Sequence, residues 1–488
     1  MRIRSKPWSA VFGSELQSDG ILNARGANRA NPWPPCTGMT AAVGIATLSW
    51  SLGNLSWSPG NVVSKLKTGP LPPMSLPIVI LNNNEKWDCH RCGICCRGSL
   101  IPLSSAEVDR LRSQKWDEQP EYRHARIMVR NRGSTSPYRL AHRADGSCVF
   151  LGDDGLCRIH AKFGKEAKPT VCQTFPLQLI PHEKQAVLTI RRACPTAAAD
   201  LGSPTSVHLP LMKQLLRDQS LKAEAIPAPL LKAGEARDWK CIRVVLESAG
   251  SLLQDQRYPP VRRLVHALQF ATLLSAAKTT KLTDQQIAEL ARTLAELVPE
   301  ESQPFFADRQ APKIYSKILF RLMAVECARL HPECRHTPKW SARFQLMKTA
   351  WKIVHGSGRA PQVDKIFPTA TFDELEKPSG AMSPDIYRPL SRFIETTSAS
   401  FLYALADRQG WSVIESIRGL ALLFPTGLWL RRWLAYGREP SAEDMVNIVV
   451  ALDRSQGYAP LCGSLHRWRL AALSAGGELE RLVVWYAS

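Results

Sequence analysis

Cysteines are concentrated in one short stretch of this chain. Of the 13 cysteines among its 488 residues, eight lie between residues 89 and 194: Cys89, Cys92, Cys95, Cys96, Cys148, Cys157, Cys172 and Cys194. The total is odd, and the basic N-terminal residues lie too far from the mildly apolar Met39–Leu55 to form a compact secretory signal. Both facts argue against a disulfide framework. Metal-bound thiolates in a reducing, cytoplasmic compartment explain the pattern better.

The spacing at the start of this stretch is typical of metal ligation. In Cys89-x2-Cys92-x2-Cys95-Cys96, each C-x2-C turn brings two thiolates to one side of a loop at the separation that a metal needs. Neighbouring cysteines point apart, so Cys95 and Cys96 are not expected to bind the same ion. One of them is expected to reach a second metal, to bridge within a cluster or to remain a thiol. The distal cysteines would complete the site or sites.

Two metals fit this arrangement. Three cysteines at x2, x2 spacing with a distant Cys194-Pro195 resemble the ligation of iron–sulfur clusters in bacterial ferredoxins, although the close fourth cysteine is absent. Eight cysteines also suffice for two zinc sites with four thiolates each. His90 and His160 are alternative ligands, but each alone is better explained as a hydrogen-bonding surface residue. We favour an iron–sulfur cluster over zinc.

Five further cysteines are scattered along the chain. They are Cys36, Cys241, Cys327, Cys334 and Cys462. Three of these, Cys241, Cys327 and Cys462, lie in apolar surroundings, where a thiol acts as a small apolar side chain. The sequence therefore predicts eight metal ligands and five cysteines outside the site.

Composition divides the chain into three parts. Residues 1–80 lack helical or strand periodicity, which is typical of a disordered extension or of a segment that precedes a true start at Met74. Residues 86–200 hold the eight cysteines among short strands and turns, and residues 205–488 show helical periodicity. We therefore predict an α+β protein, with a small Cys-rich metal-binding domain followed by a mainly α-helical domain.

Several local elements can be placed. Ser104 and Glu107 form a capping box ahead of a helix, and Asp145-Gly146 is expected to join strands 138–143 and 148–151 in a hairpin. Two more strands are predicted at 177–181 and 186–190. Helices are predicted at 239–254, 261–277, 283–298, 315–330, 342–355, 385–407, 411–435 and 441–453.

The formal charge of +20 first suggests a nucleic-acid partner. The basic excess is spread along the chain, however, at 4, 7 and 9 in residues 1–85, 86–200 and 201–488. No tract of five Lys or Arg occurs, so we argue against nucleic-acid binding. An acidic partner remains an alternative at the basic residues Arg123, Arg126, Arg130 and Arg132.

The apolar segments are too short for a membrane span. No run reaches the roughly 18 uncharged apolar residues that a spanning helix needs. The best candidate is the 12-residue stretch Gly419–Leu430, which contains Pro425. We expect this segment to be a buried helix.

Several separated blocks together resemble a known family. They are Cys89-x2-Cys92-x2-Cys95-Cys96, Cys148-Val-Phe-Leu151, Gly155-Leu-Cys157-Arg-Ile-His160, Phe163-Gly164 and Lys168-Pro169-x2-Cys172-x2-Phe175-Pro176. This run is similar to the CxxCxxCC cysteine-cluster family of zinc- or iron-chelating domains, which includes the flagellin lysine N-methylases. The resemblance covers roughly residues 86–200; beyond it, only the general plan is similar.

The resemblance implies metal binding by the eight cysteines. In the methylase branch, a 4Fe–4S cluster is associated with methyl transfer from S-adenosylmethionine to lysine side chains. The same activity here would require S-adenosylmethionine and a protein substrate, with the helical domain shaping the substrate cleft.

Other motifs give this activity little independent support. The chain has no C-x3-C-x2-C loop, Walker A, HExxH or GxSxG motif, and Gly356-Ser-Gly358, its one G-x-G, is better explained as a helix C-terminal turn. The alternative is a non-enzymatic zinc- or iron-binding module for interaction or redox sensing. Vicinal cysteines suit such a sensor, because one thiol resolves the oxidised state of the other.

Overall fold

The structure, a computed structural model, describes most of the chain after residue 75. The described residues are 76–488 without 83, 98, 132–135, 219–225, 308–309, 329–339, 365, 379, 381–382, 406–409 and 456–462. The predicted extension lies almost entirely outside them, as do Met74, Arg132, Cys36, Cys334 and Cys462. The division into three parts therefore stays a prediction.

One sheet has three strands in the order β1-β6-β5. The strands β5 (Leu177–His182) and β6 (Gln185–Ile190) form an antiparallel hairpin, and β1 (Ile78–Val79) runs parallel to β6. Five of the six residues of β6 are buried, as expected of a central strand covered on both faces. Both strands predicted at 177–181 and 186–190 are confirmed.

A second sheet has the order β2-β4-β3, formed by β2 (Pro102–Leu103), β4 (Tyr138–Leu140) and β3 (Met128–Arg130). Helix α2 (Ser105–Ser113) follows β2. Its predicted capping box is confirmed, because Ser104 Oγ accepts from the Glu107 N–H at 3.3 Å and Glu107 Oε2 accepts from the Ser104 N–H at 2.7 Å. In this sheet β4 is the central strand, so it pairs with β2 on one side and with β3 on the other.

The predicted hairpin around Asp145-Gly146 forms over a shorter length than predicted, because His142 pairs with Cys148 in an antiparallel bridge and the Val149 N–H donates to the Ala141 carbonyl at 3.0 Å, but the pairing ends at Val149. The partners of β4 are β2 and β3, and residues 148–151 form a turn, closed by a Leu151 N–H bond to the Cys148 carbonyl at 3.0 Å. All four residues of this turn are buried, with Phe150 only 1% exposed. A segment without a solvent-facing side turns into the core after this short pairing rather than continuing as a half-buried strand.

Helices dominate the described chain after residue 200. They are α6 (Leu209–Arg217), α7 (Trp239–Gln254), α8 (Pro260–Ala276), α9 (Asp284–Glu301), α10 (Pro304–Ala307), α11 (Ile314–Cys327), α12 (Trp340–His355), α13 (Phe372–Leu375), α14 (Pro384–Ala399), α15 (Leu402–Leu405), α16 (Val413–Leu434), α17 (Ala442–Ser455), α19 (Ser464–Ser474) and α20 (Glu478–Ala487). Short strands followed by a mostly helical region confirm the predicted α+β class.

One predicted helix is wrong in its extent. The segment 385–407 is divided into α14 and α15, because Phe401 takes a left-handed φ of 54° that an α-helix cannot continue. Phe401 is only 7% exposed, so its burial holds this conformation in place.

Helix α16 forms the centre of the helical core. It packs against α8, α11, α17 and α20, and its side chains are buried along almost its whole length. Within the described residues it alone is long and apolar enough to cross a membrane, but 89% of its most apolar window is buried inside the protein. The prediction of a buried helix at Gly419–Leu430 is confirmed.

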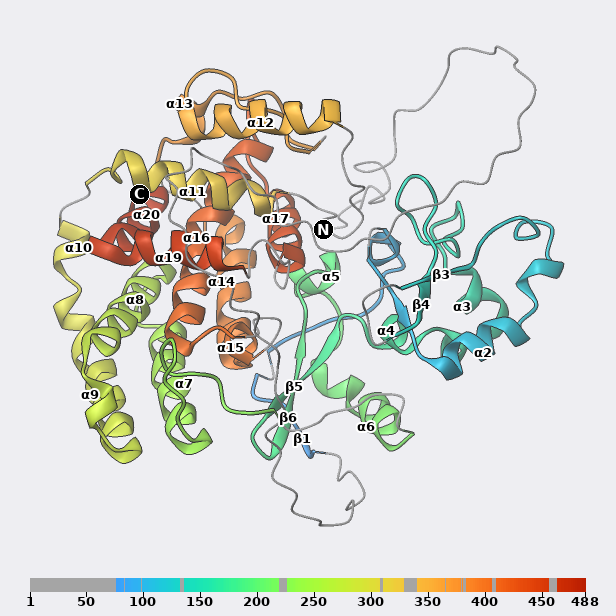
Figure 1. The fold of residues 1–488 in the computed structure, drawn as a ribbon, viewed down its shortest axis with the longest axis horizontal. Helices are drawn as coiled ribbons and strands as arrows, with labels where there is room; N and C mark the ends of the chain where they lie inside the picture. Colours follow the sequence, from blue (N-terminus) through green and yellow to red (C-terminus); the bar gives the residue numbers. More distant parts are fainter. Residues whose placement is uncertain are drawn as a thin grey trace, which may run out of the picture.

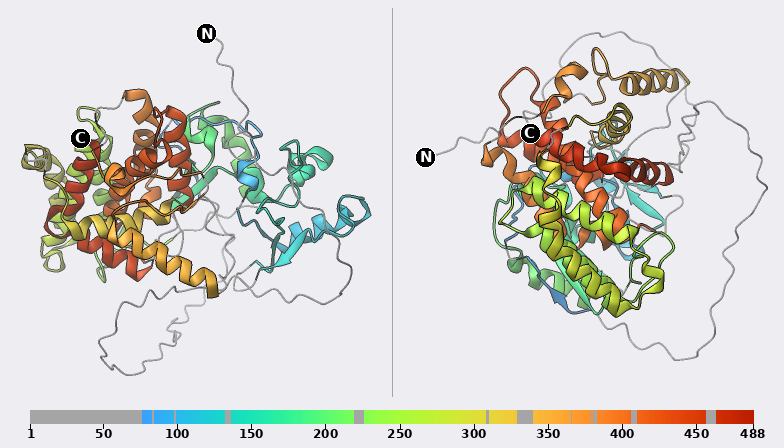
Figure 2. Two further views of the ribbon diagram at one scale, coloured as in Figure 1. Left: turned by 90° about the horizontal axis from the view of Figure 1, so that it is seen from above. Right: turned by 90° about the vertical axis from the view of Figure 1, so that its left-hand side faces the viewer.

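Figure 1 shows how these parts are arranged. The β1-β6-β5 sheet lies between the helices α7–α9 and the stretch that holds α2, α3 (Arg158–Phe163) and the β2-β4-β3 sheet. The left view of Figure 2 shows the same order from above. The short helix α5 (Pro195–Ala198) follows β6 and packs against α17. The cysteine-bearing stretch therefore meets the helical part at α5 and α17.

Candidate metal centre

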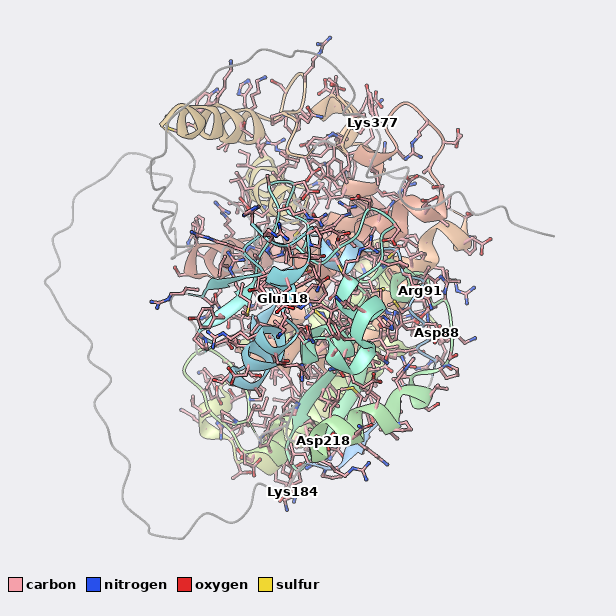
Figure 3. All side chains as sticks on the ribbon, turned by 90° about the vertical axis from the view of Figure 1, so that its right-hand side faces the viewer. Asp88, Arg91, Glu118, Lys184, Asp218 and Lys377 are labelled. Carbon is pink, nitrogen blue, oxygen red and sulfur yellow. The ribbon has the colours of Figure 1, made fainter. Side chains whose placement is uncertain are left out.

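The first cysteine loop is anchored at its start by Asp88. This carboxylate accepts from the Ser203 N–H at 2.8 Å and from Ser203 Oγ at 2.9 Å, while the Asp88 carbonyl accepts from Thr196 Oγ1 at 3.2 Å. Figure 3 shows Asp88 and Arg91 at the edge of the molecule. Because Thr196 and Ser203 follow Cys194, these bonds bring Cys89 and Cys194 to the same region.

Two left-handed residues shape this loop. Arg91 has φ 58° and Gly93 has φ 68°, so the chain reverses sharply around Cys92. A side chain at Gly93 would also come within 3.3 Å of the Gly155 carbonyl, a contact tighter than most. The glycine therefore lets the loop pack directly against the turn that precedes Cys157.

Cys95 and Cys96 lie on a short 3₁₀ turn, Ile94–Cys96. Their Sγ atoms are 4.0 Å apart. The Cys96 carbonyl accepts from the Cys148 N–H at 2.7 Å, which fixes the second cysteine-bearing segment against the first loop. The hydrogen bond between the two sulfurs, and then burial, raise the pKa of Cys95 well above its usual range. Neutral thiols are therefore favoured here unless a cation is bound.

One set of cysteines lies in the apolar cluster around Trp116 and Phe150. Cys148 is part of this cluster, and three others pack against it: Cys96, Cys157 and Cys172. Cys157 precedes α3, and Cys172 lies in α4 (Thr170–Thr174). Burial raises the pKa of Cys148 to about 11, and the nearby Cys157 adds to the rise. Burial likewise raises the pKa of Cys172, to which Cys148 and Cys157 contribute.

A second set lies on the other side of the first loop. Cys194 packs against a separate apolar cluster that contains Trp87 and Ile190, and its Sγ lies 3.1 Å from Thr196 Oγ1. Burial raises the pKa of Cys92 to about 11, and the neighbouring Cys194, Cys95 and Cys89 raise it further. Cys95 lies where the two sets meet, because its Sγ is 4.0 Å from Cys96 Sγ of the first set and its charge raises the pKa of Cys92 and Cys194 in the second.

The eight predicted ligands therefore share one region, but their side chains are not gathered into a finished site. Among the residues that the structure describes, no group of three or more Cys, His, Asp or Glu side chains is close enough to hold a metal ion. The donors nonetheless fit a metal. Buried thiols ionise only where positive charge compensates them, and a bound metal supplies that charge.

The other predicted residues are placed as follows. His90 and His160 are both exposed. Cys241 and Cys327 are buried at 2% and 4% exposure within the helical core, which confirms them as small apolar side chains. Sequence reasoning missed Asp88, Thr196 and Arg454, whose bonds to the cysteine segments bridge about 100 to 360 residues of sequence. No local spacing signals such contacts.

Eight cysteines around a C-x2-C-x2-C-C loop, most of them partly buried, place the protein in the cysteine-rich metal-binding class. Residues 88–195 match the model of the CxxCxxCC family, described as "Putative zinc- or iron-chelating domain". This part of the chain is therefore similar to the zinc- or iron-chelating domains of that family.

Curated relatives show a more distant likeness. The Lysine-N-methylases of Salmonella typhimurium (strain LT2) and Salmonella choleraesuis (strain SC-B67) are each 22% identical over 210 residues, which is 42% of this chain and 48% of theirs. The chain thus spans about half the length of the curated relatives it matches. No solved structure matches it.

Proposed function

We propose that this protein holds an iron–sulfur cluster in its cysteine domain and transfers methyl groups from S-adenosylmethionine to lysine side chains of a protein substrate. The observation that carries the metal part is that Cys96, Cys148, Cys157 and Cys172 meet at one apolar cluster, beside Cys95, whose Sγ lies 4.0 Å from that of Cys96. The methylase part is supported by the 210-residue match, which is longer than the domain at 88–195 and so extends beyond the cysteines.

The two sets of cysteines suggest a division of the ligands. The first site would use the x2, x2 loop and the distant Cys-Pro, with ligands Cys89, Cys92, Cys95 and Cys194. The second would use the thiols around the Trp116 cluster: Cys96, Cys148, Cys157 and Cys172. Because adjacent side chains diverge, this division assigns Cys95 and Cys96 to different sites. An iron–sulfur cluster would supply an electron-accepting or Lewis-acidic centre when bound.

The other residues of the centre would orient the ligands. Asp88 and Thr196 fix the loop against the segment after Cys194, and Gly93 lets it approach the Cys157 turn. Lys168 and Arg454 favour the thiolate form of Cys95 against its hydrogen bond with Cys96 and its burial, which raise its pKa. These two cations would offset part of the negative charge of a thiolate cluster.

Methyl transfer is tested by incubating the anaerobically purified protein with methyl-labelled S-adenosylmethionine and cell lysate. We expect label in methyl-lysine of one or a few proteins, and no label with the Cys92→Ser variant. The Cys327→Ser variant is the matched control, because its thiol lies in the helical core. Absence of methyl-lysine with a fully metal-loaded protein would refute the enzymatic part.

A second candidate is a non-enzymatic redox-sensing module. The observation that favours it is the pair of vicinal sulfurs, Cys95 Sγ and Cys96 Sγ, 4.0 Å apart. Mild oxidation of such a pair would release bound metal, and a thiol reductant would restore binding. Reversible, oxidant-driven metal release without methyl transfer would favour the sensor over the methylase.

A further inference from the structure

The last turn of α17 contacts a segment that leads to Cys194. The Asp453 side chain is completely buried and accepts from the Ala193 N–H at 2.6 Å, one residue before Cys194. It also accepts from Arg191 Nε at 3.0 and 3.1 Å, and Arg191 Nη2 donates to the Asp453 carbonyl at 2.8 Å. This buried carboxylate therefore holds the chain just ahead of one predicted ligand.

The next residue, Arg454, contacts both cysteine segments. Its Nη2 donates to the Ile94 carbonyl at 3.0 Å, between Cys92 and Cys95, and its Nε donates to the Ala193 carbonyl at 3.4 Å. One guanidinium thus joins two ligand-bearing segments that lie about 100 residues apart in sequence. Figure 1 shows α17 beside α5, where this contact occurs.

These bonds act on the backbone from which the thiols project. Ile94 belongs to the 3₁₀ turn that carries Cys95, and Ala193 sets the position of Cys194 at the start of α5. Groups that hold the ligand segments, without touching the metal, govern metal affinity in many proteins. The guanidinium also brings a permanent positive charge toward the thiols, and such charge favours the reduced, more negative state of a cluster.

We infer that Asp453 and Arg454 are positioning residues of the metal site, so that the helical part of the chain sets both its affinity and its potential. The inference rests on the proposed metal-binding function. Asp453 and Arg454 fix the Cys92–Cys95 loop relative to Cys194, and the charge of Arg454 raises the reduction potential of the bound cluster. The cysteine domain is then complete only when α17 is docked on it.

The test uses the full chain with Arg454→Gln, Asp453→Asn and Arg454→Lys. The matched control is Arg438→Gln, because Arg438 pairs with Asp444 in the first turn of the same helix, about 15 Å along the axis from Arg454 at about 1.5 Å per residue. Release of metal to a chelator and the reduction potential are measured for each, together with far-UV circular dichroism.

We expect Arg454→Gln and Asp453→Asn to release metal about 10- to 100-fold faster than wild type, the range typical of lost outer contacts. Arg454→Gln should lower the reduction potential, Arg454→Lys should restore it, and Arg438→Gln should change neither property. The inference would be overturned if Arg454→Gln released metal at the wild-type rate and had the wild-type reduction potential. If Asp453→Asn does not fold, the comparison of Arg454→Gln with Arg454→Lys still tests the positioning role.

Metal analysis of the wild type separates this inference from the proposed function. A wild type that holds zinc without iron refutes the iron–sulfur proposal, and the release assay then tests the positioning role on zinc. A wild type that holds iron and sulfide while all variants behave alike refutes the positioning role alone. A wild type that binds no metal refutes both.

Discussion

Glu85 makes the stability of the region around the cysteines depend on pH. Its side chain is 1% exposed and accepts from Thr189 Oγ1 at 3.1 Å, with Arg192 Nη2 at 3.7 Å. Burial raises the pKa of Glu85 from 4.5 to about 7, although Arg192 and Thr189 oppose the rise. The folded protein therefore holds this proton more tightly than the unfolded chain does.

The sign and size of the effect follow from that difference. Stability from this group is fully present below pH 4.5 and declines as the pH rises towards 7, because only the unfolded chain readily ionises Glu85 in that range. The loss amounts to about 3 kcal/mol at about 1.4 kcal/mol for each tenfold change in proton affinity. The side chain in Glu85→Gln does not ionise, so its contribution to stability does not change with pH. It keeps an oxygen that can accept from Thr189.

Urea unfolding of wild type and Glu85→Gln is to be compared at pH 5 and pH 8, with hydrogen exchange of peptides around Ile190 as a local probe. We expect the variant to be more stable by about 3 kcal/mol at pH 8 and by less than about 1 kcal/mol at pH 5. If the difference in unfolding free energy between variant and wild type is equal at both pH values, or if the variant is less stable at pH 8, Glu85 is ionised in the folded protein.

Further predictions concern the metal and the core of the cysteine domain. Cys92→Ser and Cys95→Ser should lose metal and destabilise residues 86–200, because metal binding contributes folding free energy. Cys327→Ser should keep its metal. Equal metal loss in all three variants, measured by elemental analysis, would contradict our assignment of the ligands. Trp116, 2% exposed, has its ring centroid 4.6 Å from that of Phe150 and 5.0 Å from that of Tyr122. Trp116→Ala should therefore cost about 3–5 kcal/mol in urea unfolding, against less than about 0.5 kcal/mol for Trp468→Ala, whose side chain is 61% exposed; similar losses in both would contradict the expected core.

The sequence predicts those parts of the fold that depend on neighbouring residues. The capping box Ser104–Glu107 forms as expected, because it needs only residues three apart. The turn at 148–151 and the break at Phe401 were not predictable in this way. Both depend on burial against distant elements, which local propensity does not contain.

The same distinction between local and distant contacts applies to the candidate metal site. Local spacing identifies Cys89, Cys92 and Cys95 as a ligand loop, since a C-x2-C turn alone brings thiols together. The position of this loop relative to Cys194 involves Asp453, which binds Ala193 across 260 residues, and Arg454, which binds Ile94 of the loop across 360 residues. Such contacts exist only once the helical part has folded, so no motif reveals them. The assignment of the eight ligands stays a prediction.

Iron, acid-labile sulfide and zinc, measured together on the anaerobically purified full-length protein, test the central claim most directly. The account predicts a brown protein with iron and sulfide in comparable amounts, bleached by reductant and lost in Cys92→Ser and Cys95→Ser. A colourless protein with stoichiometric zinc, or iron that persists in both variants, would contradict it.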